Sequence, residues 1–143
     1  TTLLDCSPHM HVLGREMQVA AKQPDGKVVP LIWITDWDFN WQDHYVFARP
    51  VRLPKGTRIE YEAYYDNSPA NPQNPNSPPV DVHWGELSND EMGICYFQAT
   101  ADSFEEFLEL VEHSQAEFER QLQLYLRQQA GRNGAEIPNT AQK

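Results

Sequence analysis

The chain has 143 residues, of which 40% are apolar, so it is long enough to form one compact domain with a buried core. Its formal net charge of −10 argues against nucleic acid or an anionic membrane surface as a partner. No apolar run is long enough for membrane insertion, and no signal peptide is recognisable. Because the first residue is Thr rather than Met, we expect a processed or excised piece of a longer protein.

Stretches rich in β-branched and aromatic residues, separated by turn signals, predict a series of strands. We expect these strands over residues 2–6, 16–23, 27–35, 44–48, 57–66, 80–85 and 91–100. Within residues 58–64, Ile59, Tyr61 and Ala63 fall on one face, which predicts a half-buried strand. Strands with turns every ten residues or so predict a mainly β fold, specifically an antiparallel jelly-roll-like β-sandwich.

Two segments between these strands read as irregular. Residues 36–42 mix aromatic rings with short polar groups, so we expect the rings to pack against the sheet. The carboxylates of Asp36 and Asp38 fit turns better than acid–base chemistry. Residues 67–79 contain five prolines and predict a long loop of the kind that is often functional or mobile.

A helix is predicted after the last strand. Asp102-Ser103-Phe104-Glu105 resembles a capping box with Asp102 as the N-cap, and the helix should run to about Gln129. Seven apolar residues form one stripe that must cover either the sandwich or a partner helix: Phe104, Phe107, Leu108, Val111, Phe118, Leu122 and Tyr125. We therefore divide the chain into a β-sandwich at 1–100, a helix at 101–130 and a disordered tail at 131–143.

His9-Met10-His11 is the first candidate for chemistry. In an extended segment, residues i and i+2 point to the same face, so both imidazoles could bind one ion. Met92 could add a thioether, a soft ligand that favours Cu(I). Surface histidines and core methionines are common, so His9, His11 and Met92 are a weak pattern when each is taken alone. No Ser-His-Asp arrangement stands out.

The two cysteines, Cys6 and Cys95, each lie three residues from one of these candidate ligands. They could form one disulfide, as in proteins of an oxidising compartment, or remain two buried free thiols. If a metal joins the two strands, the cysteines could also be neighbours.

The motifs Pro8-His9-Met10-His11-Val12-Leu13-Gly14 and Asp90-Glu91-Met92 resemble those of the C-terminal domain of copper type II, ascorbate-dependent monooxygenases. That family includes peptidylglycine α-hydroxylating monooxygenase and dopamine β-monooxygenase. The segments at 36–42 and 74–79 are similar to those of bacterial members, in which this domain is often fused to cytochrome or thioredoxin-like modules. The resemblance covers roughly residues 3 to 100.

The resemblance implies that His9, His11 and Met92 bind one copper ion at which O2 is activated. It also implies a second redox partner, supplied by an upstream copper domain, a cytochrome or a thioredoxin-like module, with ascorbate or another external reductant. Nothing in this chain matches the family's second copper domain, and the first strand or strands of the family domain are expected before Thr1. A periplasmic or extracellular location would follow.

The resemblance also assigns the substrate-binding positions. Tyr96 matches the family's site tyrosine and is the candidate catalytic residue, but Ser7 and Ile94 replace the family's Arg and Asn, so a peptidylglycine substrate is not expected. Gly93 replaces the Cys that follows the ligand Met in animal enzymes. We expect a domain of a copper-dependent monooxygenase-like protein that hydroxylates an unknown C–H substrate. The alternative is a non-catalytic copper-binding, interaction or structural subunit of a larger redox assembly.

Overall fold

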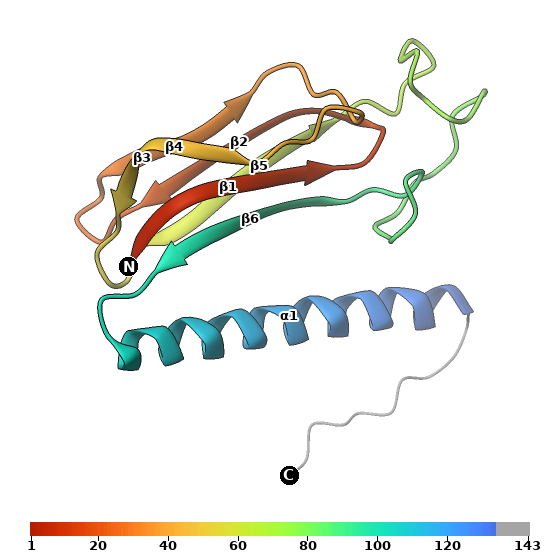
Figure 1. Ribbon diagram of the computed structural model, residues 1–143. Coiled ribbons are helices and arrows are strands. Elements are labelled where there is room, and N and C mark those ends of the chain that lie inside the picture. The colour runs from red at the N-terminus through yellow and green to blue at the C-terminus, as the bar shows by residue number, and fades with distance from the viewer. Residues whose placement is uncertain (134–143) are drawn as a thin grey trace. The chain divides into compact units, whose positions relative to one another are not determined.

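The computed structural model describes residues 1–133, which contain six strands and one helix (Figure 1). The elements are β1 (Thr2–Met10), β2 (Gly14–Lys22), β3 (Val28–Ile34), β4 (Tyr45–Arg52), β5 (Arg58–Tyr65), β6 (Gly93–Thr100) and α1 (Phe104–Asn133). The prediction of a mainly β fold followed by a C-terminal helix is confirmed. By its contacts the chain divides into two compact units, Thr1–Asp102 and Ser103–Lys143.

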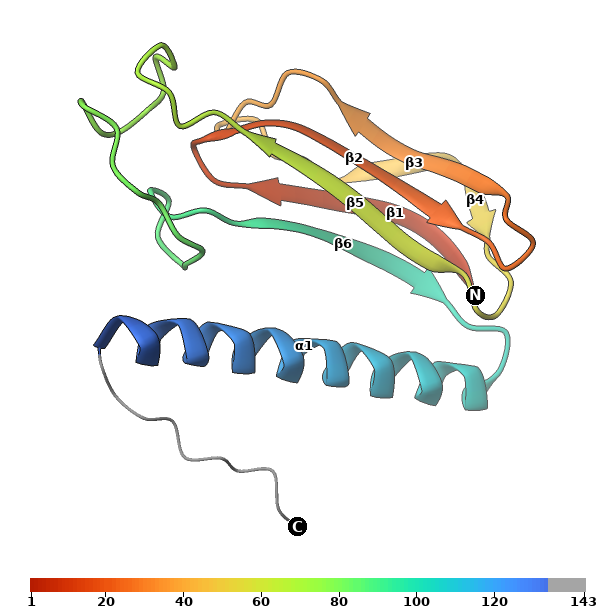
Figure 2. The same ribbon diagram turned by 180° about the vertical axis from the view of Figure 1, so that it is seen from behind.

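The strands form two three-stranded antiparallel sheets. One sheet has the order β4-β1-β6, and the other has the order β3-β2-β5 (Figure 2). The connections β1–β2, β3–β4, β4–β5 and β5–β6 all cross from one sheet to the other, and only β2 and β3 are joined within a sheet. Because β1 is the central strand of its sheet, its side chains are positioned from both sides.

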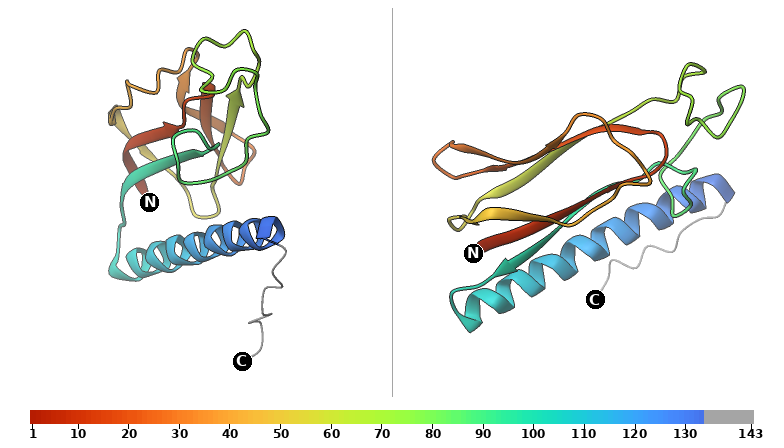
Figure 3. Two further views of the ribbon diagram at one scale, coloured as in Figure 1. Left: turned by 90° about the vertical axis from the view of Figure 1, so that its right-hand side faces the viewer. Right: turned by 45° about the horizontal axis from the view of Figure 1, so that its top comes forward.

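The two sheets share a core that lies between two layers of strands (Figure 3). Met17 and Val19 alternate along β2 and are buried together with Met10 of β1. Cys95 and Phe97 of β6 pack against the same cluster from the opposite sheet. Each sheet thus shields the apolar face of the other from water. This burial of apolar surface is the main contribution to the stability of such a fold.

β5 has the predicted alternation but is less buried than expected. Its residues Ile59 and Tyr61 lie opposite the buried Ala21 and Val19 of β2 and therefore point to the same face as they do. Both side chains are nevertheless exposed, so the expectation of a half-buried strand is wrong at these two positions. The physical reason is that β5 is an edge strand, covered on one side only.

Pro8 explains where β1 and β4 separate. β1 extends to Met10 rather than ending at Cys6, and its ladder with β6 continues over that whole length. The ladder with β4 stops at the pair Cys6–Tyr45. Alternation along β1 directs the backbone nitrogen of Pro8 toward β4, and proline has no N–H to donate there. A gap therefore opens between β1 and the segment that precedes β4.

The strand predicted at residues 80–85 is wrong. This region forms a single isolated bridge, Trp84–Glu91, inside the long connection between β5 and β6, drawn in green in Figure 1. Two hydrogen bonds make this bridge: Glu91 N–H donates to the His83 carbonyl (2.8 Å) and Gly85 N–H to the Glu91 carbonyl (3.1 Å). Local turns thus replace sheet pairing.

Only some of the aromatic rings in the segment at 36–42 pack against the sheet as expected. Trp37 is buried against the core, whereas Trp41 is exposed. Asp38 accepts a hydrogen bond from the Asn40 backbone N–H at 2.8 Å, which confirms its expected use in a turn.

The helix begins one residue later than predicted. Ser103 is the N-cap, because its Oγ accepts from the Glu106 backbone N–H at 3.1 Å. Asp102 does not cap the helix, since its carboxylate is paired with the Arg52 guanidinium. The helix ends at Asn133 rather than near Gln129, so residues 131–133 of the predicted tail are helical, and residues 134–143 lie outside the described part of the chain. Within residues 1–133, no helix combines the length and apolarity needed to cross a membrane.

Candidate metal site

The three predicted ligands lie on neighbouring segments, where β1 ends and β6 begins. His9 lies opposite Ile94 in the ladder, and the His11 backbone N–H donates to the Met92 carbonyl at 3.3 Å, which continues the same register. Directly opposite residues of an antiparallel pair point to one face. His9, His11 and Met92 therefore share a face of the β4-β1-β6 sheet, as the resemblance requires.

The two imidazoles have a spacing that suits one ion. Their ring centroids are 5.1 Å apart, and their planes are 88° to each other. Imidazole nitrogens bind first-row metals at about 2.0 Å, so two rings on one tetrahedral ion would have centroids roughly 5 Å apart. The observed separation is compatible with shared coordination without movement of either strand.

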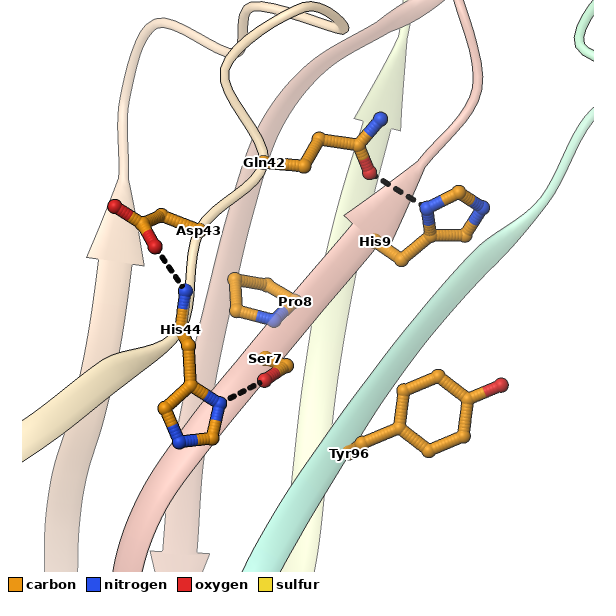
Figure 4. A pocket seen from close by; sticks show the side chains of 7 residues that line it. All are labelled: Ser7, Pro8, His9, Gln42, Asp43, His44 and Tyr96. Atoms are coloured by element: carbon orange, nitrogen blue, oxygen red, sulfur yellow. Dashed lines mark hydrogen bonds between the residues drawn. The ribbon is translucent and has the colours of Figure 1, made fainter.

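In each ring, one nitrogen is occupied by an oxygen acceptor and the other is left for a ligand. His9 Nδ1 donates to Gln42 Oε1 at 2.6 Å (Figure 4), and His11 Nδ1 donates to the Asp90 carbonyl at 3.1 Å. The Gln42 amide nitrogen in turn donates to the Phe39 carbonyl at 2.7 Å, which fixes its oxygen toward His9. Both rings therefore present the lone pair of Nε2, as metal-binding histidines do.

Burial favours the form of His11 that binds metal. His11 is 5% exposed, and this desolvation lowers the pKa of its imidazole. Its deprotonated ring is thus the stable form at neutral pH, and metal binding does not have to displace a proton from it. The nearby carboxylates of Asp90 and Glu86 act in the opposite direction on the pKa, and they also make the surroundings attractive to a cation.

Met92 supplies the third predicted donor. Its side chain is 7% exposed, so the thioether lies in a largely desolvated position. In the part of the chain that the structure describes, no three side chains of His, Cys, Asp or Glu are grouped so that they could hold a metal. A metal at this position would thus depend on the sulfur of Met92.

The loop before β6 positions both Met92 and the acceptor of His11. Asp90 Oδ2 accepts from the Leu87 backbone N–H at 3.0 Å, and the Asp90 N–H donates to the Leu87 carbonyl at 2.8 Å. Ser88 is tied to the turn after β1, because its carbonyl accepts from the Val12 N–H at 3.4 Å. These bonds hold the Asp90 carbonyl beside His11.

An open pocket of about 390 Å³ adjoins His9 in the gap that Pro8 creates (Figure 4). Tyr96, the predicted catalytic residue, lies on β6 opposite Ser7, and its side chain is 62% exposed. The remaining lining residues come from β1 and from the segment before β4: Ser7, Pro8, His9, Gln42, Asp43 and His44. No Lys or Arg lines this pocket, so it offers no fixed cation to a substrate carboxylate.

The pocket wall contains a Ser-His-Asp arrangement that was not recognised in the sequence. His44 Nε2 lies 3.0 Å from the buried carboxylate of Asp5, and His44 Nδ1 lies 2.7 Å from Ser7 Oγ. Such residues can activate a nucleophile, but Ser7 is inside a paired strand, where its N–H faces β6 and is not available to an oxyanion. We interpret the arrangement as structural: His44 is held by Asp5 and in turn fixes the orientation of the Ser7 hydroxyl. His44 lies 37 residues from Ser7, so no local pattern signals the contact.

The two cysteines are neighbours because they lie on the paired strands β1 and β6. Their thiols lie within hydrogen-bonding distance in the core, and both are free. The register places Cys6 opposite Phe97 and Cys95 opposite Pro8, so the cysteines are diagonal rather than directly opposed. Burial raises the pKa of both thiols, that of Cys95 to about 12, so they are protonated and unreactive near neutral pH.

His83 and Asn71 help to organise the long connection between β5 and β6. The His83 carbonyl accepts from Glu91 N–H within the loop before β6. Asn71, which is buried, donates to the Asp66 carbonyl at 2.7 Å and organises the proline-rich loop.

Comparisons with models of protein families, with curated proteins and with solved structures found no match to this chain.

Proposed function

We propose that residues 1–100 form the mononuclear copper-binding, oxygen-activating domain of a copper-dependent monooxygenase-like protein. One observation carries the proposal. Two imidazoles on one strand face, 5.1 Å apart, each have Nδ1 engaged by an oxygen and Nε2 free, beside the buried Met92 of the paired strand. The finer description of the fold as a jelly roll belongs to the same proposal.

The donor set favours copper over other metals. Two imidazoles suit several first-row metals, but a thioether is a soft ligand that selects Cu(I). Structural zinc sites usually have four Cys or His ligands, whereas the described residues contain no group of even three His, Cys, Asp or Glu side chains that could hold a metal. A set of three protein ligands also leaves a position open for a small molecule.

Different residues of the chain would bind the metal, orient the ligands and contact the substrate. His9, His11 and Met92 hold the ion, while Gln42 and the Asp90 carbonyl orient the two rings. When bound, copper would supply the one-electron chemistry by which O2 is activated toward a C–H bond. The substrate would lie in the pocket beside His9 and against Tyr96.

Turnover requires partners outside residues 1–133. Electrons would come from an upstream or separate redox partner, a second copper domain, a cytochrome or a thioredoxin-like module, with ascorbate or another reductant as the source. A periplasmic or extracellular location would be consistent with this chemistry. No Lys or Arg lines the pocket, which supports a substrate without a carboxylate at this point.

Metal analysis of the full chain tests the proposal. After anaerobic loading with Cu(I) and desalting, we expect one copper per wild-type chain and a loss of most copper in His9→Ala and Met92→Ala. His113→Ala, on α1, is the matched control and should retain the metal. Equal copper content in all four proteins would overturn the ligand assignment.

Ascorbate-driven oxygen consumption by the copper-loaded chain, measured with an added redox partner, separates the two classes of function. Consumption that depends on His9 and Met92 would support a monooxygenase. If copper binds through these residues but no substrate class stimulates consumption, the domain is the non-catalytic copper-binding alternative.

A further inference from the structure

The hydroxyl of Ser7, in the pocket beside His9, is held in one orientation. Asp5, Ser7 and His9 alternate along β1 and therefore share one face of the strand. His44, the residue before β4, contacts two of them. Its Nε2 lies 3.0 Å from Asp5 Oδ2, and its Nδ1 lies 2.7 Å from Ser7 Oγ (Figure 4). Both nitrogens of this imidazole are thus engaged.

Asp5 decides which nitrogen of His44 carries the hydrogen. Asp5 is 3% exposed, and its Oδ1 accepts from the Gln98 backbone N–H at 3.2 Å. An ionised carboxylate can only accept hydrogen bonds, so its contact with His44 requires a hydrogen on Nε2. A neutral imidazole has a single N–H, which leaves Nδ1 as an acceptor. The hydrogen bond between Nδ1 and Ser7 is therefore donated by the Ser7 hydroxyl.

This orientation makes the pocket wall at Ser7 a hydrogen-bond acceptor. A hydroxyl has one hydrogen and two lone pairs. Because the hydrogen is directed to His44, only the lone pairs remain for a molecule in the pocket. The Pro8 carbonyl adds a second acceptor, since it lies on the same side of β1 as the proline nitrogen, beyond the pair Cys6–Tyr45 at which the ladder with β4 stops.

We propose that Ser7 determines specificity for the substrate and that His44 is its positioning residue. The substrate carries an O–H or N–H group that donates to Ser7 Oγ, whereas a group that can only accept finds no hydrogen there. That the pocket holds a substrate rests on the proposed function. The hydrogen-bonding character of the pocket does not depend on copper, so it can be tested on the metal-free chain and separately from the metal analysis.

Nitrogen NMR of the isotope-labelled, metal-free full chain at neutral to slightly alkaline pH tests the role of His44. We expect its Nε2 to be protonated and its Nδ1 to be unprotonated, as the contacts with Asp5 and Ser7 require. A neutral ring protonated at Nδ1 would overturn the proposal, because Nδ1 would then donate to Ser7 and leave the hydroxyl hydrogen for the pocket.

Titration of the metal-free chain with benzyl alcohol and with benzyl methyl ether tests the acceptor at Ser7. Both probes have the same ring, but only the alcohol can donate a hydrogen bond. The wild type should bind the alcohol about two- to tenfold more tightly, which is the range that one hydrogen bond supplies, as followed by NMR shifts of Tyr96. Ser7→Thr should keep this preference and Ser7→Ala should lose it. Ser114→Ala, on α1, is the matched control and should behave like the wild type.

His44→Leu should also lose the preference, because the freed Ser7 hydroxyl can then donate to the ether oxygen. Should this variant fail to fold, the Ser7 variants still carry the test. Equal binding of both probes by the wild type, or saturable binding of neither, would overturn the proposal whatever the copper content of the protein. Benzylamine distinguishes the two kinds of donor: binding tighter than that of the alcohol and lost in Asp43→Asn indicates an ammonium group, and weaker binding indicates a hydroxyl.

Discussion

At the scale of single residues, the candidate site depends on two acceptors that are not ligands. Gln42 Oε1 and the Asp90 carbonyl each take the Nδ1 proton of one histidine and thereby fix its tautomer. Partners of this kind orient the ring and raise its basicity. Gln42 is the more accessible to test, because its side chain makes the contact, whereas at Asp90 the backbone does.

Gln42→Leu should weaken Cu(I) binding by about tenfold to a hundredfold, since His9 would lose the acceptor that holds its tautomer. Competition titration against a chromophoric Cu(I) chelator measures the effect. Gln18→Leu, on β2 in the other sheet, is the control and should bind Cu(I) like the wild type. An unchanged affinity in Gln42→Leu would show that the contact with His9 does not support metal binding.

Among the residues of the site, those joined by local rules could be predicted from the sequence. His9 and His11 share a face because they are two apart in a strand, and this follows from spacing alone. His44 could not be found in this way, because its partners Asp5 and Ser7 are brought to it by the register of β1 with β4. That register is a long-range property which the sequence does not display.

At the scale of elements, the open edge of the core between β5 and β6 is bridged by two tyrosines. The Tyr61 hydroxyl donates to the Gly93 carbonyl at 2.8 Å, and the Tyr65 hydroxyl occupies the space beside the Gly93 α-carbon. Burial raises the pKa of the Tyr65 phenol, which keeps this hydroxyl neutral. Gly93 directly follows Met92, so this contact also bears on the position of the third ligand.

Gly93→Ala should reduce the free energy of unfolding by about 1–3 kcal/mol, because a β-carbon would lie 2.5 Å from the Tyr65 hydroxyl oxygen. Tyr65→Phe removes that oxygen. The double variant should therefore be more stable than the sum of the two single effects predicts, which urea denaturation of all four proteins can measure. Strict additivity would contradict the proposed close contact.

The boundaries of the elements show where reasoning from patterns fails. The strand predicted at 80–85 has suitable residues, but its backbone finds only the single bridge Trp84–Glu91. The helix cap was placed at Asp102, and the choice between Asp102 and Ser103 depends on Arg52, which is 50 residues away. In both cases a distant partner decides between two locally acceptable structures.

At the scale of the whole molecule, the chain combines two units of different structure, one built of strands and one containing a helix. The unit Thr1–Asp102 contains the candidate ligands on neighbouring segments, and the unit Ser103–Lys143 contains the helix α1. Composition and periodicity predicted both kinds of structure, since the apolar pattern changes from the two-residue period of a strand to the stripe of a helix between them. The chemistry of the first unit remains a proposal, and its central claim concerns which atoms bind the metal.

X-ray absorption spectroscopy at the copper edge of the Cu(I)-loaded full chain tests that claim most directly. We expect two imidazole nitrogens and one sulfur in the first coordination shell of the wild type. Met92→Leu should lose the sulfur contribution, whereas Met17→Leu, in the core of the other sheet, should retain it. A wild-type shell without sulfur, or a sulfur signal that persists in Met92→Leu, would contradict the account.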